Sequence, residues 1–270
     1  MKKPIKILLI VLSLAFLAAF LSWVFWANTA LECNQYTLTE ANLPESFDGL
    51  RIAHVSDLHS AEMGQDNEKL IAMLWQTHPD LIVITGDLMD CRDTDTAIAL
   101  SFARDAAMIA PCYYVTGNHE VRLPADLYAQ LLDGLAAAGV TVLMDASIQI
   151  FRGEESITIT GQAWGDTDVC VKSDSEDYKI LLAHTPEFFD LYAEAGFDLV
   201  FSGHNHSGQF RLPFVGGLYT PSQGLFPDYD SGHYANGNTD MIVSRGIGNS
   251  TFPLRFNNRP EVILVELKCA

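Results

Sequence analysis

The order of apolar and polar residues divides the chain into an apolar N-terminal run, a polar stretch and a long alternation of strand-like and helix-like segments. Three short apolar runs predict buried strands, at residues 51–56, 80–85 and 112–116. Three segments with helical periodicity follow them, at residues 67–77, 94–109 and 125–138. Because strands that alternate with helices are joined by crossover connections, this part of the chain predicts a largely parallel sheet.

Beyond Val140 the pattern changes to shorter strand-like runs, and only residues 186–195 look helical. These runs lie at residues 141–144, 148–151, 157–161, 180–183, 199–202, 241–244 and 261–267. They predict a second sheet that packs against the first. Residues 212–238 are rich in Gly and Pro and too long for an ordinary connection, and loops of that size are often functional.

The N-terminal segment from Ile7 to Trp26 carries no charged side chain over 20 residues. At about 1.5 Å per residue, a helix of this length spans roughly 30 Å, the thickness of a bilayer's hydrocarbon core. Lys2, Lys3 and Lys6 precede it, so the positive-inside rule places the N-terminus in the cytoplasm and the remainder outside. A cleaved signal peptide is the alternative, although its apolar region is usually about 7–15 residues long, with small residues at the cut.

These patterns predict a single-pass cell membrane protein with an extracytoplasmic domain. Residues 1–30 are expected to be a cytoplasmic stub and transmembrane anchor, residues 31–48 a juxtamembrane segment, and residues 49–270 one folded domain. No composition shift or linker divides that domain.

Composition limits the class of function. The chain has 270 residues, 49% of them hydrophobic and 19% charged, which is typical of a globular protein. A net charge of −18 opposes binding to nucleic acid through a basic surface, so no nucleic-acid partner is expected, and nothing indicates an obligate protein partner. The five cysteines fit no C-x-x-C pattern, and an odd number cannot all pair within one chain. They are Cys33, Cys91, Cys112, Cys170 and Cys269. We expect most of these cysteines to be small residues buried in the core.

Polar clusters follow five of the predicted strands, where packing alone does not require them. They are Asp57-Leu58-His59, Gly86-Asp87-Leu88-Met89-Asp90, Gly117-Asn118-His119-Glu120, Ala183-His184-Thr185 and Gly203-His204-Asn205-His206. Ligand sites of open α/β sheets lie outside the carboxyl ends of the strands. Each cluster alone also fits a turn, a helix cap or a hydrogen-bonded structural histidine. Their combination beside successive strands favours a metal site.

These residues resemble the calcineurin-like metallophosphoesterase family. Its pattern D-x-H, G-D-x-x-D, G-N-H-[DE], H and G-H-x-H is present in full and spans most of the chain after the apolar run. The segments Gly208–Pro213 and Ser244–Gly248 are similar to the membrane-anchored bacterial branch of that family. The resemblance implies a four-layer α/β/β/α sandwich of two mixed sheets.

The resemblance also implies a two-metal centre with assigned roles. The first metal would be held by Asp57, His59, Asp87 and His206. The second would be held by Asp87, Asn118, His184 and His204, with Asp87 bridging the two. His119 would be the catalytic histidine, and Asp90 would orient it.

The chemistry of these residue types agrees with the implied roles. Nitrogen and oxygen ligands without thiolate suit two divalent ions of Mn²⁺, Zn²⁺ or Fe. Two ions about 3.5–4 Å apart can clamp phosphoryl oxygens and lower the pKa of a bridging water, and the hydroxide then attacks phosphorus. An imidazolium can protonate the leaving oxygen, and a carboxylate beside it favours its charged form.

The expected function is therefore metal-dependent hydrolysis of a phosphomonoester, phosphodiester or pyrophosphate bond. The anchor favours a membrane-associated or lipid-linked phosphorylated substrate, and some relatives resemble UDP-diacylglucosamine pyrophosphatase, although a cytoplasmic substrate conflicts with the predicted orientation. The alternatives are a phosphoprotein or cell-wall phosphate hydrolase, or a non-catalytic binding module stabilised by metal. Asn205, Arg122, Arg211 and Arg245 are candidates for holding phosphate oxygens, since guanidinium suits bidentate recognition, but surface ion pairs explain the arginines equally well.

Overall fold

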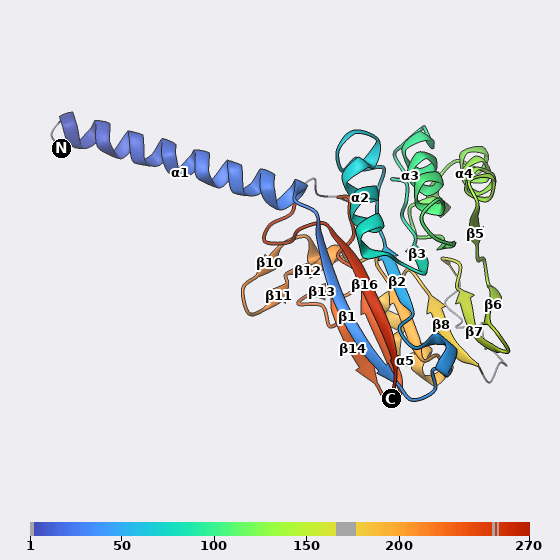
Figure 1. Cartoon of the computed structure of the whole chain (residues 1–270). Coiled ribbons are helices and arrows are strands. Elements are labelled where there is room, and N and C mark those ends of the chain that lie inside the picture. Colours follow the sequence, from blue (N-terminus) through green and yellow to red (C-terminus); the bar gives the residue numbers. More distant parts are fainter. Residues whose placement is uncertain (1–2, 166–176, 250–251, 253) are drawn as a thin grey trace.

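Two six-stranded sheets lie face to face in the computed structural model, which describes residues 3–165, 177–249, 252 and 254–270 (Figure 1). The first sheet has the order β1 (Glu32–Glu40), β16 (Glu261–Cys269), β2 (Arg51–Val55), β3 (Leu81–Thr85), β4 (Cys112–Val115) and β5 (Val140–Val142). The second has the order β14 (Gly232–Asn236), β15 (Thr239–Val243), β9 (Leu199–Ser202), β8 (Tyr178–Leu182), β7 (Glu155–Gly161) and β6 (Ala146–Arg152). Both sheets combine parallel and antiparallel pairs, which confirms the predicted sandwich of mixed sheets.

Strand β3 explains why its sequence is apolar at every position. Leu81 and Val83 pack between the two sheets, whereas Ile82 and Ile84 face the helices on the outside of the first sheet. Successive side chains of a strand point to opposite faces, so a strand covered on both faces is hydrophobic throughout. The covering helices are α2 (Glu68–Thr77), α3 (Ala97–Ala107) and α4 (Ala125–Ala137). The short helix α5 (Phe189–Glu194) covers the second sheet and completes the four layers.

The folded domain begins before residue 49, where the sequence pattern places its start. Strand β1 pairs along its whole length with β16, so half of residues 31–48 belongs to the first sheet. The sequence pattern does not predict this strand, because it lies at the edge of the sheet and only Leu38 and Glu40 are buried. Strand β16 returns from the C-terminal part of the chain and lies between β1 and β2, antiparallel to β2.

The Gly- and Pro-rich segment 212–238 forms small antiparallel hairpins beside the second sheet. The first hairpin joins β10 (Arg211–Leu212) to β11 (Gly216–Gly217), and the second joins β12 (Tyr219–Thr220) to β13 (Gly224–Leu225). Strand β14, which pairs with β15, lies in the same segment and was also absent from the sequence prediction.

Helix α1 (Lys3–Thr29) projects away from the domain and is long and apolar enough to cross a membrane (Figure 1). Its side chains are exposed along most of its length, and Ala27 near its end is buried. The indole of Trp23 packs edge-on against Phe256 at 4.7 Å between ring centroids. The guanidinium of Arg259 lies 4.7 Å from the ring centre of Trp26, so the end of the helix is held against the domain.

Candidate metal centre

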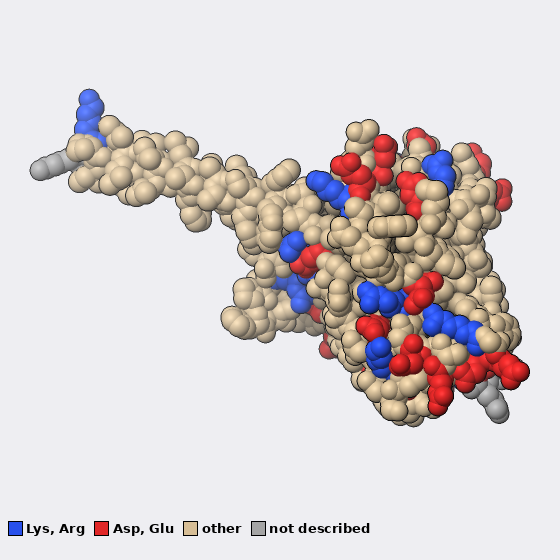
Figure 2. All heavy atoms as spheres, in the orientation of Figure 1, with Lys and Arg blue, Asp and Glu red and all other residues tan. Residues whose placement is uncertain are grey.

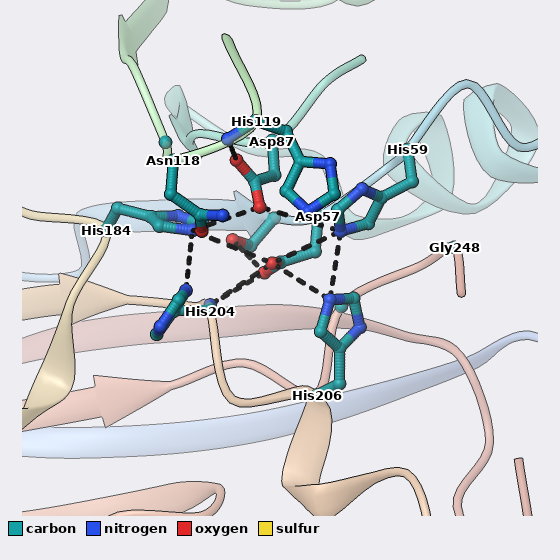
Figure 3. A network of polar contacts seen from close by, with 12 residues as sticks. Asp57, His59, Asp87, Asn118, His119, His184, His204, His206 and Gly248 are labelled. Atoms are coloured by element: carbon teal, nitrogen blue, oxygen red, sulfur yellow. Dashed lines mark hydrogen bonds and ion pairs between the residues drawn. The ribbon is translucent and has the colours of Figure 1, made fainter. Parts of the chain in front are cut away.

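The five polar clusters meet at one edge of the sandwich, as the sequence predicts (Figure 3). The clusters follow β2, β3 and β4 in the first sheet and β8 and β9 in the second. The parallel strands bring their carboxyl ends to the same edge, and the two sheets face each other there. Side chains separated by as many as 149 positions along the chain, from Asp57 to His206, thus become neighbours.

A first group of donors surrounds a point between the two sheets. The Nε2 atoms of His59 and His206 lie 2.9 Å apart, and His206 Nε2 lies 3.3 Å from Asp57 Oδ1. His59 Nε2 is 3.8 Å from Asp57 Oδ1 and 3.6 Å from Asp87 Oδ2. All four side chains named here are almost completely buried.

A second group shares Asp87 with the first. His184 Nε2 lies 3.3 Å from Asp87 Oδ2, 3.3 Å from Asn118 Oδ1 and 3.2 Å from His204 Nδ1. Figure 3 shows these side chains converging on one side of Asp87, with His59 and His206 on the other. The carboxylate of Asp87 therefore stands between two sets of donors.

The residues fit a pair of divalent ions by distance and by chemistry. Ligands about 2.1 Å from a tetrahedral or octahedral ion lie about 3.0–3.4 Å from one another, and most of the distances above fall near that range. The donors are imidazole nitrogens and amide or carboxylate oxygens, which suit Mn²⁺, Zn²⁺ or Fe. Three sets of donors, all buried except the half-buried His204, could hold an ion among the described residues: Asp57, His59 and His206; Asp87, His184 and His204; and His59, Asp90 and His119.

Backbone strain is concentrated at this edge. Five of the converging residues have a positive φ between 45° and 70°: Asp57, His59, Asp87, His204 and His206. Left-handed backbone at residues other than Gly costs of order 1–3 kcal/mol each and persists where the surroundings enforce it. The packing of the sandwich thus stabilises side-chain directions that the local chain disfavours.

Two glycines allow the strand ends to approach each other. A Cβ at Gly203 would lie 1.9 Å from Ser56 Oγ and 2.3 Å from Asp57 Oδ2. A Cβ at Gly117 would lie 2.2 Å from Asp87 Oδ1. The glycines of the G-N-H and G-H-x-H motifs therefore leave room for the two carboxylates.

The electrostatics of the site balance buried carboxylates against buried imidazoles. Burial disfavours the charged form of His184, but the carboxylate of Asp87 and that of Asp57 outweigh it and raise the pKa of His184 to about 10. Burial likewise opposes ionisation of Asp57, yet neighbouring imidazoles, that of His206 foremost, hold its pKa well below the usual range. Divalent ions can take the place of these protons, since carboxylate and imidazole bind metal in their deprotonated forms.

His119 lies beside the first group, with its ring edge-on to His59 at 4.5 Å between centroids. Its Nδ1 accepts a hydrogen bond from the backbone N–H of Cys91 at 3.1 Å, so the proton of the neutral ring lies on Nε2. Burial is the largest influence on the ring and lowers the pKa of His119. The geometry therefore favours a neutral donor rather than an imidazolium.

Asp90 makes no direct hydrogen bond to His119 and instead holds the loop that follows β3. Its nearest approach to His119 Nδ1 is 3.8 Å. Its Oδ1 accepts hydrogen bonds from the backbone N–H of Arg92 at 2.9 Å and from Arg92 Nε at 2.7 Å. These bonds fold the loop so that the N–H of Cys91 between them faces the histidine.

Two further residues support the centre and were given no role by the sequence. Glu120 is buried, and its carboxylate accepts the N–H groups of Asp87, Met89 and Gly117 at 2.8–3.1 Å. Burial and the charge of Asp87 raise the pKa of Glu120 to about 7. Glu120 occupies the last position of the G-N-H-[DE] motif, so the motif could have identified it as a residue of the site.

Arg255 is the second supporting residue, and no sequence motif marked it. It is 1% exposed and its guanidinium donates to the carbonyl oxygens of Arg245 and Gly248. Its Nη2 lies 3.3 Å from Nδ1 of His206, behind the first group of donors.

Other candidates from the sequence lie apart from the centre or are engaged elsewhere. Two histidines outside the five clusters have structural or surface positions: His54 is buried within β2 with Nε2 2.8 Å from Thr85 Oγ1, and His78 is exposed. Arg211 pairs with Asp230, and Arg245 pairs with Glu32 and Glu261. Of the three candidate arginines, Arg122 is the one that lines a cavity beside the metal centre. Among the cysteines, Cys112 is buried and Cys33, Cys91 and Cys269 are half-buried, whereas Cys170 lies outside the described residues.

Two adjoining cavities open at the centre. One of about 720 Å³ extends from Asp87, Asn118 and His119 past Arg122 to an apolar wall of Phe210, Leu218, Tyr219, Pro221 and Phe252. The other, of about 480 Å³, is lined mainly by apolar and aromatic groups, including Phe188 and Tyr192. Trp164, His204 and Ser222 border both. The site can therefore accept organic groups on two sides of the donors.

The comparisons with known proteins agree with this geometry. Residues 50–208 match the model of the family described as calcineurin-like phosphoesterase. The chain is 31% identical to the uncharacterized metallophosphoesterase YkuE of Bacillus subtilis, over 88% of this chain and 86% of that protein. It is 30% identical to the phosphodiesterase YaeI of Escherichia coli, over 80% of this chain and 82% of that protein.

A further relative bears on the apolar helix. The chain is 28% identical to a transmembrane protein with metallophosphoesterase domain from Danio rerio, over 84% of this chain and 55% of that protein. With α1, the one helix among the described residues that is long and apolar enough to cross a membrane, this relative indicates a single-pass membrane protein. From the family match, the relatives and the clustered donors, the chain belongs to the calcineurin-like phosphoesterase family and is a metal-dependent phosphoester hydrolase.

Proposed function

We propose that this protein hydrolyses a phosphodiester or pyrophosphate bond of a substrate carried at the outer surface of the membrane. The observation that carries the proposal is the pair of donor groups that share Asp87 at the junction of two cavities. Each of the two organic groups of a phosphodiester would occupy one of the two cavities, whereas the single organic group of a monoester would occupy only one. The name of the relative from Escherichia coli supports the same type of bond.

The proposed metal ligands are the seven residues expected from the motifs. Asp57, His59, Asp87 and His206 would hold one ion, and Asp87, Asn118, His184 and His204 the other. When bound, the two ions would stabilise the phosphoryl oxygens and lower the pKa of an attacking water. The chain's own contribution is to fix these donors in strained, buried positions so that they need no rearrangement.

His119 is proposed as the catalytic residue that contacts the substrate. With its Nδ1 held by the N–H of Cys91, its Nε2–H is free to donate a hydrogen bond to an oxygen that gains charge as the phosphorus bond breaks. Asp90 is a positioning residue, because its carboxylate holds the loop that carries Cys91. Arg122 lines the cleft and is placed to hold a substrate phosphate oxygen.

The proposed orientation places the domain outside the cytoplasm. Lys2, Lys3 and Lys6 precede the apolar segment of α1, and positive charges favour the cytoplasmic side. A reporter fused after Ala270 that is active only outside the cytoplasm would support this orientation, and one active only inside would overturn it.

The test of the proposed function compares two esters with the same leaving group. The full chain in detergent, stripped with a chelator and reloaded with Mn²⁺ or Zn²⁺, is assayed on bis-p-nitrophenyl phosphate and on p-nitrophenyl phosphate. We expect metal-dependent turnover with kcat/KM higher for the diester. A preference for the monoester would overturn the proposed bond type.

Three variants assign the roles. His119→Ala should lower kcat by about 10²–10³-fold while both ions stay bound, as expected for loss of one hydrogen-bond donor. Asp87→Ala should remove both turnover and bound metal, and His78→Asn, which changes an exposed histidine, should alter neither. Retained turnover in His119→Ala would refute its role. A folded, metal-loaded protein without turnover on either ester would favour the binding-module alternative.

A further inference from the structure

The two small hairpins beside the metal centre expose apolar side chains that the fold does not cover. Phe214 is fully exposed at the β10–β11 turn, with Val215 57% exposed beside it. Leu225 is 67% exposed and Phe226 57% exposed at the end of the second hairpin. Residues 212–226 carry no charged side chain, although the protein as a whole has a net charge of −18.

These hairpins lie beside the end of the membrane helix. Figure 1 shows β10–β13 on the side of the domain where α1 enters. A stack of rings connects them: Trp23 of α1 packs on Phe256, and Phe256 lies parallel to Phe210 at 6.1 Å between centroids. Phe210 directly precedes β10, so the helix end and the hairpins form one continuous apolar surface.

The distribution of charge agrees with this arrangement. In Figure 2 the surface of the hairpins is largely free of red and blue, and basic and acidic side chains lie together between the hairpins and α1. The acidic side chains gather over α2 and α3 and at the end of the domain away from α1. The arginines of this region are paired with Asp230, Glu32 and Glu261, so the uncharged apolar hairpins are what the domain presents toward the membrane helix.

We propose that the exposed apolar side chains of these two hairpins insert into the interfacial layer of the same bilayer that α1 spans. They are Phe214 and Val215 at the tip of the first hairpin, and Leu225 and Phe226 where the chain leaves the second. The bilayer is the occupant because the apolar surface is continuous with a helix long and apolar enough to cross a membrane. A helix alone fixes the domain at one point, and a second contact restricts its tilt.

Contact between the hairpins and the bilayer would fix the position of the 720 Å³ cavity relative to the membrane. The same segment supplies Phe210, Leu218 and Tyr219 to the wall of the 720 Å³ cavity, and Tyr219 is the strand partner of Leu225. Insertion of these apolar side chains therefore places the apolar wall of the cavity at the level of the lipid headgroups. This consequence rests on the proposed function, and it makes a lipid with a phosphodiester headgroup the class of substrate.

The contact itself is tested with nitroxide labels on the full chain, whatever the protein hydrolyses. Phe214→Cys and Phe226→Cys, each with the native cysteines replaced by Ser or Ala, are labelled and reconstituted into vesicles of phosphatidylcholine and phosphatidylglycerol. Phe151→Cys is the matched control, because Phe151 is 63% exposed on β6 in the second sheet. Collision with oxygen and with aqueous chromium oxalate reports whether each label lies in lipid or water.

We expect the labels at positions 214 and 226 to collide more with oxygen than with chromium oxalate, and the label at 151 to do the reverse. Labels that are all accessible to chromium oxalate would overturn the proposal. Dipolar broadening between labels that grows with protein density would also overturn it, in favour of contact with a second copy.

A kinetic experiment tests the consequence for the substrate. In the variant with Phe214→Ser and Phe226→Ser, turnover of vesicle-borne diacylglycerol p-nitrophenyl phosphate should fall at least tenfold, while turnover of soluble bis-p-nitrophenyl phosphate is unchanged. Equal loss on both esters, or on neither, would overturn the consequence. Absence of turnover in the unaltered protein would instead refute the proposed function and leave the label result standing.

Discussion

The side chain of Asn28, at the end of α1, pairs with the backbone of Arg255 through both ends of its amide. Asn28 Oδ1 accepts the N–H of Arg255 at 2.7 Å, and Asn28 Nδ2 donates to the carbonyl oxygen of Arg255 at 3.0 Å. The guanidinium of Arg255 in turn lies behind His206. The membrane helix is thereby joined to a segment that supports the metal centre.

The first prediction concerns this junction. Asn28→Ala removes two hydrogen bonds to a half-buried stretch of backbone and should lower stability by about 1–2 kcal/mol. Thr29→Ala is the control, because the hydroxyl of Thr29 bonds only within α1, to the carbonyl of Phe25. Thermal unfolding of the full chain in detergent measures both. Equal midpoints for the two variants would show that the pairing does not stabilise the junction.

The second prediction concerns the space at Gly203. Gly203→Ala would force a methyl group against Ser56 and Asp57, so bound metal should fall together with a loss of about 1–3 kcal/mol of stability. Gly237→Ala is the comparison: Gly237 has a φ of +63° and open space around it, so that variant meets backbone strain alone. Metal analysis after gel filtration separates them. A full complement of metal in Gly203→Ala would contradict the close approach.

The third prediction concerns pH and a carboxyl group far from the metal centre. Glu40 is 7% exposed, and its burial, with the charges of Asp240 and Asp198, raises its pKa from 4.5 to about 7. The folded protein therefore binds a proton at Glu40 that the unfolded chain releases between about pH 4.5 and 7. The stability from this protonated group is complete below pH 4.5 and is lost as pH rises through 7.

Glu40→Gln imitates the protonated group at every pH. Its melting temperature should match that of the unaltered protein near pH 4.5 and exceed it at pH 8. Glu154→Gln, at an exposed position, should show no such difference. If the gap between Glu40→Gln and the unaltered protein is the same at both pH values, then burial does not shift this carboxyl group.

The fourth prediction concerns recognition of the substrate by Trp164, which borders both cavities and packs against His204 at 5.2 Å between ring centroids. Trp164→Ala should raise KM for the diester roughly tenfold, since an aromatic contact and its buried area are lost. Trp164→Phe should restore most of the affinity. A fall in kcat with KM unchanged would show that the ring supports the donors instead of the substrate.

Much of the sandwich was predictable because its strands are buried on both faces. β2, β3, β4 and β9 were located within one or two residues, since each is a mainly apolar run that is followed by a polar cluster. β1 and β14 were not predicted, because both lie at sheet edges and mix exposed polar residues with few buried ones. The half-exposed edge strand gives too weak an alternation to recognise.

The sequence by itself determined which residues meet at the metal centre, because strand order and parallel pairing bring the five motifs to one edge. Only the tertiary structure decided how they are held. Arg255 and the Cys91 N–H reach the centre through loops whose paths no periodic pattern encodes. The same is true of the apolar side chains of the hairpins, whose exposure depends on what the rest of the chain leaves uncovered. Local patterns fix strands and motifs, whereas contacts between distant loops depend on the packing of the whole chain.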